Sequence, residues 1–382
     1  MKVPNDDAVA TVNGYGSSAA ARCEWDDAHL ICRLTRFADV YGALRNHRDF
    51  SSRRLLRTDK QQSPGGGGAS ILITDDPPRH TALRSIVSSR FTSKAVELLR
   101  PWIVEAARRL TTSLKSGAMD AARVFAEPLP VMSIAYVLGL QAGDWQTLKQ
   151  WSHALLKWNT GSATKQERQL AIAAHLHLAA ALRQKRTDPT NDVITRLSEA
   201  LNLTGGLSDS EARAYCVLLL TAGNETTTNL IANSLNVLLD RSPLWKAFRE
   251  GEVPVSGIIN ETLRFDSPVQ VVRRVVTRHT QLNGLEFEAG NIVELCLGAA
   301  HRDPNEFVCP DSFVVNRDFT GHVAFGRGVH FCLGASLAKL VAESALMEFA
   351  RRFSLLRREA AATRLDSYVL SGFSSLPVVV AT

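Results

Sequence analysis

The sequence lacks several features that would place it in a whole class of proteins. It contains no run of about 18–20 uninterrupted apolar residues, so a membrane-spanning helix is not expected. Its first residues, MKVPNDDAVATVNGYGS, carry one lysine and no apolar core, so a secretory signal peptide is not expected either. No internal repeat and no βαβ alternation are visible, which argues against solenoid and doubly wound folds.

Cysteine is sparse and scattered. The chain has six cysteines among 382 residues, and no two of them form a CxxC pair. Together with the missing export signal, this favours a reduced cytoplasmic protein without a disulfide framework, and no spacing suits a zinc site.

The charge carries little information about function. The net charge is +6, but the basic residues are spread along the chain and do not gather in one tail. Nucleic-acid binding is therefore not expected, whereas an acidic protein partner is compatible with this balance.

Helical patterns dominate the chain from residue 36 onward. Residues 1–25 are rich in Asp, Gly, Ser and Ala and are expected to be flexible, which leaves 26–382 as a single domain. Residues 268–299 are β-branched and broken at Asn283-Gly284, which is typical of a hairpin. The expected class is mainly α, or α+β, with segregated small sheets. Helical spacing is found in segments near 36–48, 78–90, 94–116, 128–138, 143–158, 164–185, 190–202, 208–240, 254–266 and 335–353.

The segment with the clearest chemistry is 325–334, which reads FGRGVHFCLG and precedes a predicted helix. Gly326 and Gly328 allow a backbone with positive φ that can approach an acceptor closely. Cys332 then stands just before a helix N-terminus, where free N–H groups favour a thiolate. Such a thiolate, with Phe325 beside it, suits a haem iron whose reactivity N–H···S bonds tune. A buried cysteine next to a turn is the alternative, and the complete pattern disfavours it.

A second unusual segment interrupts the apolar helix predicted over 208–240. Residues 222–227 read AGNETT, and a glycine followed by polar side chains is costly inside a buried helix. The Thr226 hydroxyl could disturb the local hydrogen-bond ladder and open a polar groove beside Glu225. A capped or kinked structural helix is the alternative.

A third segment, 75–84, reads DDPPRHTALR. Its prolines predict a helix start, which places His80 and Arg84 one turn apart on the same face. Two donors in this arrangement can bind a carboxylate.

These segments resemble the cytochrome P450 family, and the resemblance covers roughly residues 35–380. FGRGVHFCLG fills every defining position of the family's haem-binding loop, AGNETT is similar to its acid–alcohol motif, and DDPPRHTALR to its DPPxHxxxR element. The resemblance implies a P450 fold, in which a large helical region and a small β-rich region enclose haem b.

The resemblance also implies roles for individual residues. Cys332 is the implied axial ligand of the iron. Alternation along a strand lets only one of Arg273 and Arg274 face inward, and Arg274 is favoured as the propionate ligand by its spacing from Arg264. The full set of implied haem-binding residues is His80, Arg84, Arg274, Phe325, His330, Cys332 and Gly334.

Two further sets of residues follow from the same resemblance. Thr226 would hydrogen-bond oxygen at the iron, and Glu225 would relay protons to it. The positions expected to face the substrate are mostly apolar, which favours a hydrophobic molecule. They are Leu219, Ala222 and Thr226 in the central helix, and Val271 and Val272 in the first strand of the hairpin region.

The chain departs from the family pattern in three places. Glu261 and Arg264 resemble its structural ExxR pair, but Ser312 stands where an arginine often joins them, and Arg317 is a possible substitute. The first helix and part of the first sheet are expected to be missing or abbreviated. The four-glycine tract in 61–70 lies where the family has a variable substrate-facing loop, and a mobile lid is favoured there over a plain surface loop.

The implied reaction is insertion of one oxygen atom from O₂ into a small organic molecule. No flavin or iron–sulfur module is visible, so electrons are expected from a separate ferredoxin-type partner, with Arg327 and Lys339 as candidate contacts. Two alternatives stay open. One is peroxide-driven or atypical oxidation, such as coupling or desaturation, on the same fold. The other is a non-catalytic haem-thiolate binding protein.

Overall fold

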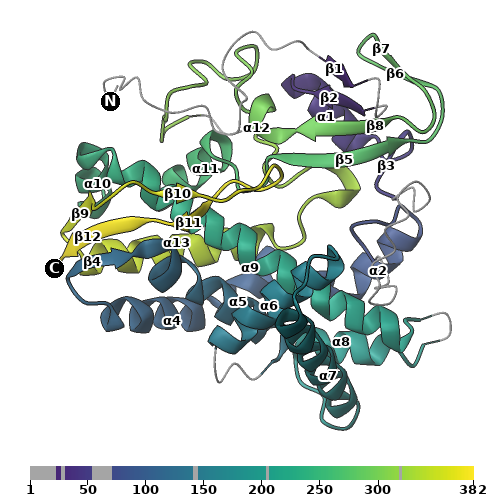
Figure 1. The fold of residues 1–382 in the computed structure, drawn as a ribbon, viewed down its shortest axis with the longest axis horizontal. Coiled ribbons are helices and arrows are strands. Elements are labelled where there is room, and N and C mark those ends of the chain that lie inside the picture. Colours follow the sequence, from purple (N-terminus) through teal and green to yellow (C-terminus); the bar gives the residue numbers. More distant parts are fainter. Residues whose placement is uncertain (1–22, 27–30, 54–70, 141–144, 204–205, 318–320) are drawn as a thin grey trace.

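Helices make up most of the protein, as its computed structural model shows (Figure 1). The expected mainly helical class with small sheets is therefore confirmed. The structure describes residues 23–26, 31–53, 71–140, 145–203, 206–317 and 321–382. The N-terminal residues expected to be flexible and the four-glycine tract lie almost wholly outside these ranges.

The helices follow the periodic segments of the sequence closely. The longest, α9, begins at a capping box in which the Ser208 side chain accepts from the Glu211 N–H. The α-helices are α1 (Phe37–Arg45), α2 (Arg79–Ser88), α3 (Ser93–Glu97), α4 (Arg100–Ser113), α5 (Pro128–Leu138), α6 (Trp145–Asn159), α7 (Lys165–Thr187), α8 (Val193–Ala200), α9 (Asp209–Leu239), α10 (Ser242–Arg249), α11 (Val255–Phe265), α12 (Leu297–Ala300) and α13 (Ala335–Arg352). A π-helical turn, η2 (Ala122–Ala126), precedes α5, and a 3₁₀ turn, η3 (Gly328–His330), precedes α13.

The strands form four small sheets. The largest has the order β1-β2-β8-β5-β3, in which β2 and β8 are parallel and the other pairs antiparallel. The strands are β1 (Cys23–Asp26), β2 (Ile31–Leu34), β3 (Phe50–Ser51), β4 (Gly117–Asp120), β5 (Val271–Val276), β6 (Thr280–Leu282), β7 (Leu285–Phe287), β8 (Ile292–Cys296), β9 (Leu355–Arg358), β10 (Thr363–Arg364), β11 (Phe373–Ser375) and β12 (Pro377–Ala381).

The Asn283-Gly284 turn confirms the predicted hairpin. Asn283 has φ 51° and Gly284 has φ 84°, and they connect β6 to β7. Positive φ at both central residues is the geometry that an Asn-Gly pair favours.

Three expectations from the sequence are wrong. The helix predicted over 94–116 is divided into α3 and α4, because Pro101 lacks the N–H needed inside a helix and starts α4 instead. The first sheet is not abbreviated, since β1 and β2 form one edge of it. Cys23 and Cys32, which these two strands carry, form a disulfide, so the cysteines are not all free.

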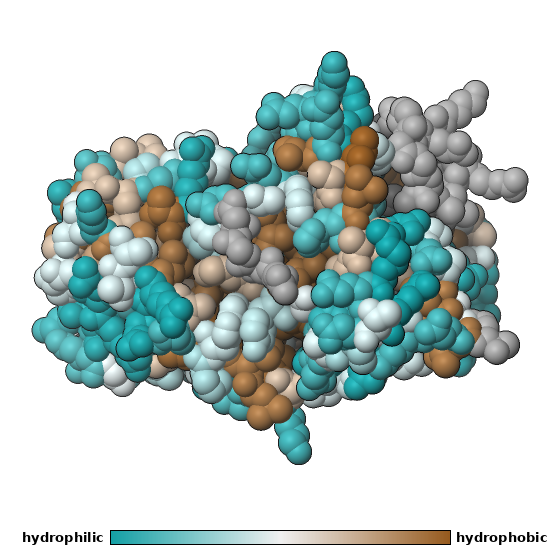
Figure 2. Space-filling model, turned by 90° about the horizontal axis from the view of Figure 1, so that it is seen from below, coloured by the Kyte–Doolittle hydropathy of each residue, from teal (hydrophilic) through white to brown (hydrophobic). Residues whose placement is uncertain are grey.

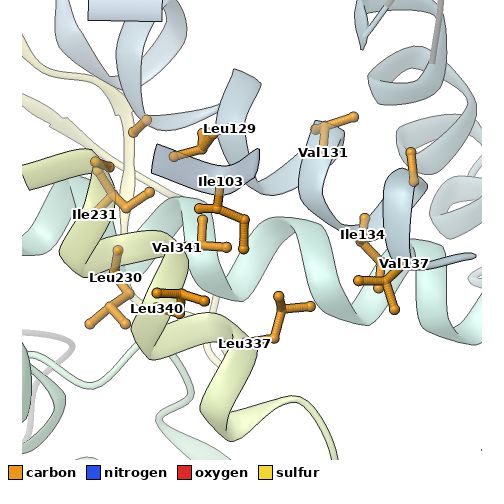
Figure 3. Packing of buried hydrophobic residues seen from close by; sticks show 14 of the residues in the cluster. Ile103, Leu129, Val131, Ile134, Val137, Leu230, Ile231, Leu337, Leu340 and Val341 are labelled. Carbon is orange, nitrogen blue, oxygen red and sulfur yellow. The ribbon is translucent and has the colours of Figure 1, made fainter. Parts of the chain in front are cut away.

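The main hydrophobic core lies among the helices. Ile103 of α4, Leu129 and Ile134 of α5, Leu230 of α9 and Leu340 of α13 all meet in it (Figure 3). Their burial holds α9 through the middle of the molecule, between the helical layer and the five-stranded sheet (Figure 1). A second core, which includes Phe50, Phe287 and Leu295, packs that sheet against α1.

The surface has ordinary polarity. Seen from below, hydrophilic residues cover much of the molecule and hydrophobic ones are concentrated near the middle (Figure 2). None of the helices in the described part of the chain combines the length and apolarity that crossing a bilayer requires.

Candidate active site

The cysteine loop is shaped by its glycines. Gly326 and Gly328 both have φ 68°, and they turn the chain so that the Cys332 N–H donates to the Phe325 carbonyl over 2.8 Å. A Cβ on Gly328 would lie 2.9 Å from the Leu44 carbonyl oxygen, so no side chain fits there. The loop is therefore held against the end of α1 by direct backbone contact.

The Cys332 thiol lies just before α13. It is accessible to solvent, although protein atoms surround it closely enough that burial raises its pKa. The Gly334 N–H donates to the sulfur, and this bond, together with the positive charge of Arg84, acts in the opposite direction and favours the thiolate. Gly334 thus contacts the sulfur through its backbone, as expected for a loop that holds a thiolate ligand.

Two histidines meet beside this loop. His80 on α2 and His330 on η3 have ring centroids 4.4 Å apart. Burial is the main reason that the pKa of each is lowered, that of His330 to about 4, and nearby arginines add to the effect. Nδ1 of His80 and Nε2 of His330 are buried without a hydrogen-bond partner in the described residues, since Asp76 Oδ1 is 3.8 Å from His330.

The two adjacent arginines of β5 face different surroundings, as alternation predicted. Arg273 pairs with the buried Glu294 carboxylate at 2.7 Å. Arg274 is half-buried, and its charge acts on His330, so it lies on the side of the cysteine loop. Burial lowers the pKa of Arg274 to about 10.

These groups suit a ligand that carries carboxylates. Around His80 and His330 lie the cations Arg84 and Arg274, whereas the nearby carboxylate of Asp76 is held by the Ser51 hydroxyl and the Ser52 N–H. A hollow of about 330 Å³ beside α2 is lined by Arg84, by three hydroxyl side chains and by Val329 of the loop. Buried ring nitrogens without a partner, together with two arginines and a cysteine, suit the two propionates and the iron of haem.

The AGNETT segment lies in the middle of α9 (Figure 1). The Thr226 hydroxyl donates to the Ala222 carbonyl over 2.9 Å, which leaves its oxygen free to accept. Glu225 is half-buried, and its charge adds to the burial that raises the pKa of Glu127 at the start of α5. The helix is continuous here, so the predicted opening of its ladder is not seen.

The four apolar positions predicted to face a substrate do not behave alike. Leu219 and Val271 are 8% and 3% exposed, whereas the Ala222 side chain is exposed. Val272 packs against the second core, on the face of β5 opposite to Val271. This position does not favour a substrate contact for Val272.

Behind the loop, the Glu261–Arg264 pair is completely buried. The Arg264 guanidinium makes two 2.8 Å bonds to Glu261 and donates to the carbonyls of His301, Pro310 and Ser312. Arg317 Nε lies 3.3 Å from Glu261 Oε1, so it takes the place that Ser312 leaves empty. The sequence already suggested this substitution.

Asn224 was not singled out by the sequence. Its side chain is fully buried and donates to Ser152 Oγ of α6 over 3.3 Å. Only its place within AGNETT could have drawn attention to it, because the partner lies 72 residues away.

Comparison with known proteins agrees with this geometry. The cytochrome P450 family model matches residues 255–371. Cytochrome P450 107B1 of Saccharopolyspora erythraea is 36% identical, over 97% of this chain and 91% of its own. Erythromycin C-12 hydroxylase of the same organism is 33% identical, over 98% and 95%.

A solved structure shows the same fold. The crystal structure of CYP109E1 from Bacillus megaterium in complex with testosterone has a TM-score of 0.83 and 31% sequence identity, and the match covers 95% of both chains. The family's defining cofactor is a haem whose iron is bound by a cysteine thiolate. The chain therefore belongs to the cytochrome P450 family and is a monooxygenase.

Proposed function

We propose that this protein binds haem b through Cys332 and inserts one oxygen atom from O₂ into a small, largely hydrophobic molecule in the cytoplasm. The observation that carries the proposal is the Cys332 loop with the unpartnered ring nitrogens of His80 and His330 beside it, and Thr226 of α9 adds a hydroxyl whose oxygen is free to accept. Phe325 packs against the main core next to the loop and would cover the thiolate side of the haem.

The chain's own residues perform the proton chemistry in this proposal. Haem, when bound, supplies the iron at which O₂ is activated. While the Thr226 hydroxyl donates to the Ala222 carbonyl, its oxygen can accept a hydrogen bond from a water molecule. When the Thr226 hydroxyl turns away from the Ala222 carbonyl, it can release its own proton toward the site where O₂ is activated, and the Glu225 carboxyl, one residue earlier, replaces that proton on Thr226 Oγ.

The residues proposed to face the substrate are apolar, which would favour a hydrophobic substrate. Leu219, Ala222 and Val271 present only hydrocarbon side chains, so a charged molecule would lose its hydration without compensation. The testosterone complex of the CYP109E1 structure makes steroids reasonable first compounds to test.

Electrons are proposed to come from a ferredoxin-type protein. Arg327 and Lys339 are weaker contacts than the sequence suggested, because Arg327 donates to the His322 carbonyl and Lys339 to the Asn260 side chain. Lys94 is exposed on α3, whose Ser93 contacts Ser336 at the start of α13 over 3.1 Å, and it is a better candidate. A net charge of +6 favours an acidic partner.

A spectroscopic screen tests the proposal directly. Addition of testosterone, followed by a library of hydrophobic compounds, is expected to shift the haem from low to high spin for those that bind. The compounds that bind should then be oxidised with NADPH, ferredoxin and ferredoxin reductase. Equal turnover with hydrogen peroxide alone would favour peroxide-driven oxidation, and no NADPH consumption with any compound would favour a non-catalytic protein.

A further inference from the structure

A buried amide connects the oxygen-handling segment to a neighbouring helix. The Asn224 side chain donates to Ser152 Oγ over 3.3 Å, and the Thr228 hydroxyl donates to Asn224 Oδ1 over 3.5 Å. Asn224 is 0% exposed and Ser152 is 1% exposed. These three side chains form a small polar network inside the main hydrophobic core, between α6 and α9.

Packing alone does not account for this network. A buried amide costs free energy unless its donors and acceptor are hydrogen-bonded, and a leucine would fill nearly the same volume without that cost. Relative to an apolar side chain at this position, the network therefore lowers the stability of the protein, but it makes a directional contact between two particular helices.

The same face of α6 makes a second polar contact one turn earlier. Lys149 Nζ is 3.8 Å from Glu127 Oε1, just before α5 begins. Lys149 and Ser152 are i and i+3, so they lie on one face of α6. This half of α6 is consequently fixed to both α5 and α9 by polar side chains.

Other positions of α6 contact α7. The rings of Trp151 and His177 are 4.9 Å apart, and His153 Nε2 is 3.4 Å from Glu167 Oε1. A displacement of α7 would therefore be passed to α6, and from there to Ser152.

The α9 backbone has little room to yield at this point. A Cβ at Gly223 would lie 3.0 Å from Ile134 of α5, so the two helices are in close contact one residue before Asn224. Glu225 and Thr226 directly follow Asn224 in the helix, so the contact of Asn224 with Ser152 helps to hold these two residues in place relative to α6.

We propose that Asn224 and Ser152 are positioning residues that make the placement of Glu225 and Thr226 depend on the position of α6. The inference rests on the proposed function, because it assumes that Glu225 and Thr226 handle protons. Its consequence is that a displacement of α6 relative to α9 changes the placement of Glu225 and Thr226 through one side-chain contact.

Four variants of the haem-loaded enzyme test the inference. Ser152→Ala removes the acceptor, and Ser152→Thr retains a hydroxyl. Ser234→Ala is the matched control. Like Ser152, Ser234 is buried, but it lies on α9 and its hydroxyl donates to the Leu230 carbonyl of its own helix. Thr226→Ala tests the proposed function independently.

Two measurements separate positioning from simple packing. Hydrogen exchange of the amides over 222–228 should accelerate roughly three- to tenfold in Ser152→Ala, the factor expected for one lost hydrogen bond. The second measurement is the share of NADPH electrons recovered as hydrogen peroxide with testosterone, ferredoxin and ferredoxin reductase. This share should rise roughly threefold in Ser152→Ala, because misplaced groups deliver protons less well. Ser152→Thr and Ser234→Ala should remain near the parent protein in both.

The outcomes are distinct. If Thr226→Ala raises the peroxide share but Ser152→Ala does not, the inference is wrong and the proposed function stands. If Ser234→Ala matches Ser152→Ala in both measurements, the effect is one of general packing and the inference is again wrong. If neither Thr226→Ala nor Ser152→Ala changes the peroxide share, the proton-handling role of this segment is itself wrong.

Discussion

Two polar clusters flank the cysteine loop, and they differ in how completely their donors are used. In the cluster of Glu261, Arg264 and Arg317, all five N–H groups of the Arg264 guanidinium have acceptors. In the cluster of His80 and His330, a ring nitrogen of each histidine is buried without a partner in the described residues.

This difference separates a structural cluster from a binding site. Buried donors are normally paired within the protein, so a saturated cluster such as that of Arg264 has no capacity left for a ligand. Unpaired donors indicate that something outside the chain completes them, and carboxylates are the natural acceptors for His80, His330 and Arg274. Variants of Cys332, Arg264 and Arg84 test this distinction, in order of decreasing effect. A separate prediction concerns pH.

The largest effect is expected at the thiolate. Cys332→Ser removes the sulfur that would bind the iron, so the reduced protein with carbon monoxide should lose the absorption band specific to thiolate ligation, together with all NADPH-dependent oxidation. Cys309→Ser is the control, because Cys309 is free and exposed. A band typical of histidine ligation in the parent protein would contradict the assignment.

The saturated cluster should determine stability. Arg264→Lys breaks a buried, fully bonded pair and should lower the free energy of unfolding by about 3–5 kcal/mol in urea titrations. Arg317→Lys, at the edge of the cluster, should cost about 1–2 kcal/mol and remain folded for measurement. Equal, small losses in both variants would show that the cluster is not structural.

The unsaturated cluster should determine cofactor retention instead. Arg84→Gln should release haem to apomyoglobin roughly tenfold faster, because one charge-assisted contact to a carboxylate is lost. The same substitution should change the stability of the apoprotein by no more than about 0.5 kcal/mol. A large loss of apoprotein stability would place Arg84 with the structural cluster.

A further effect, a pH dependence of stability, is expected from His322, whose ring centroid lies 6.0 Å from that of Phe325. The folded protein holds the pKa of His322 at about 4, mainly through burial, whereas the unfolded chain titrates near ~6.5. Between these values only the unfolded chain binds the proton, so the free energy of unfolding should fall as pH decreases, by up to ~1.4 kcal/mol per pH unit for one proton. In urea titrations of the apoprotein between pH 6.5 and 4.5, His322→Asn should reduce the dependence of the unfolding free energy on pH by this amount at most. An unchanged pH dependence would contradict the assignment.

The sequence predicted the parts of the site that are local in the chain. Cys332 and Gly334 are two residues apart, and strand alternation was enough to predict that Arg273 and Arg274 have different surroundings, while their proposed haem contacts stay predictions. The exchange of Ser312 for Arg317 was also foreseeable, because the two residues are five positions apart and a guanidinium is long.

The contacts between distant segments could not be predicted. β2 pairs in parallel with β8 about 260 residues later, and four-residue strands carry too little alternation to be recognised. The Asn224–Ser152 contact joins two helices whose relative rotation no local pattern determines. The internal bond from Lys339 to Asn260 was missed for the same reason.

The place of Arg317 has a consequence for reading other chains of this kind. A comparison made column by column would count Ser312 as a lost cation and the cluster as defective. In space the charge is retained, because Arg317 reaches Glu261 from further along the loop. The guanidinium beside this carboxylate is therefore supplied by a residue five positions further along the chain than Ser312.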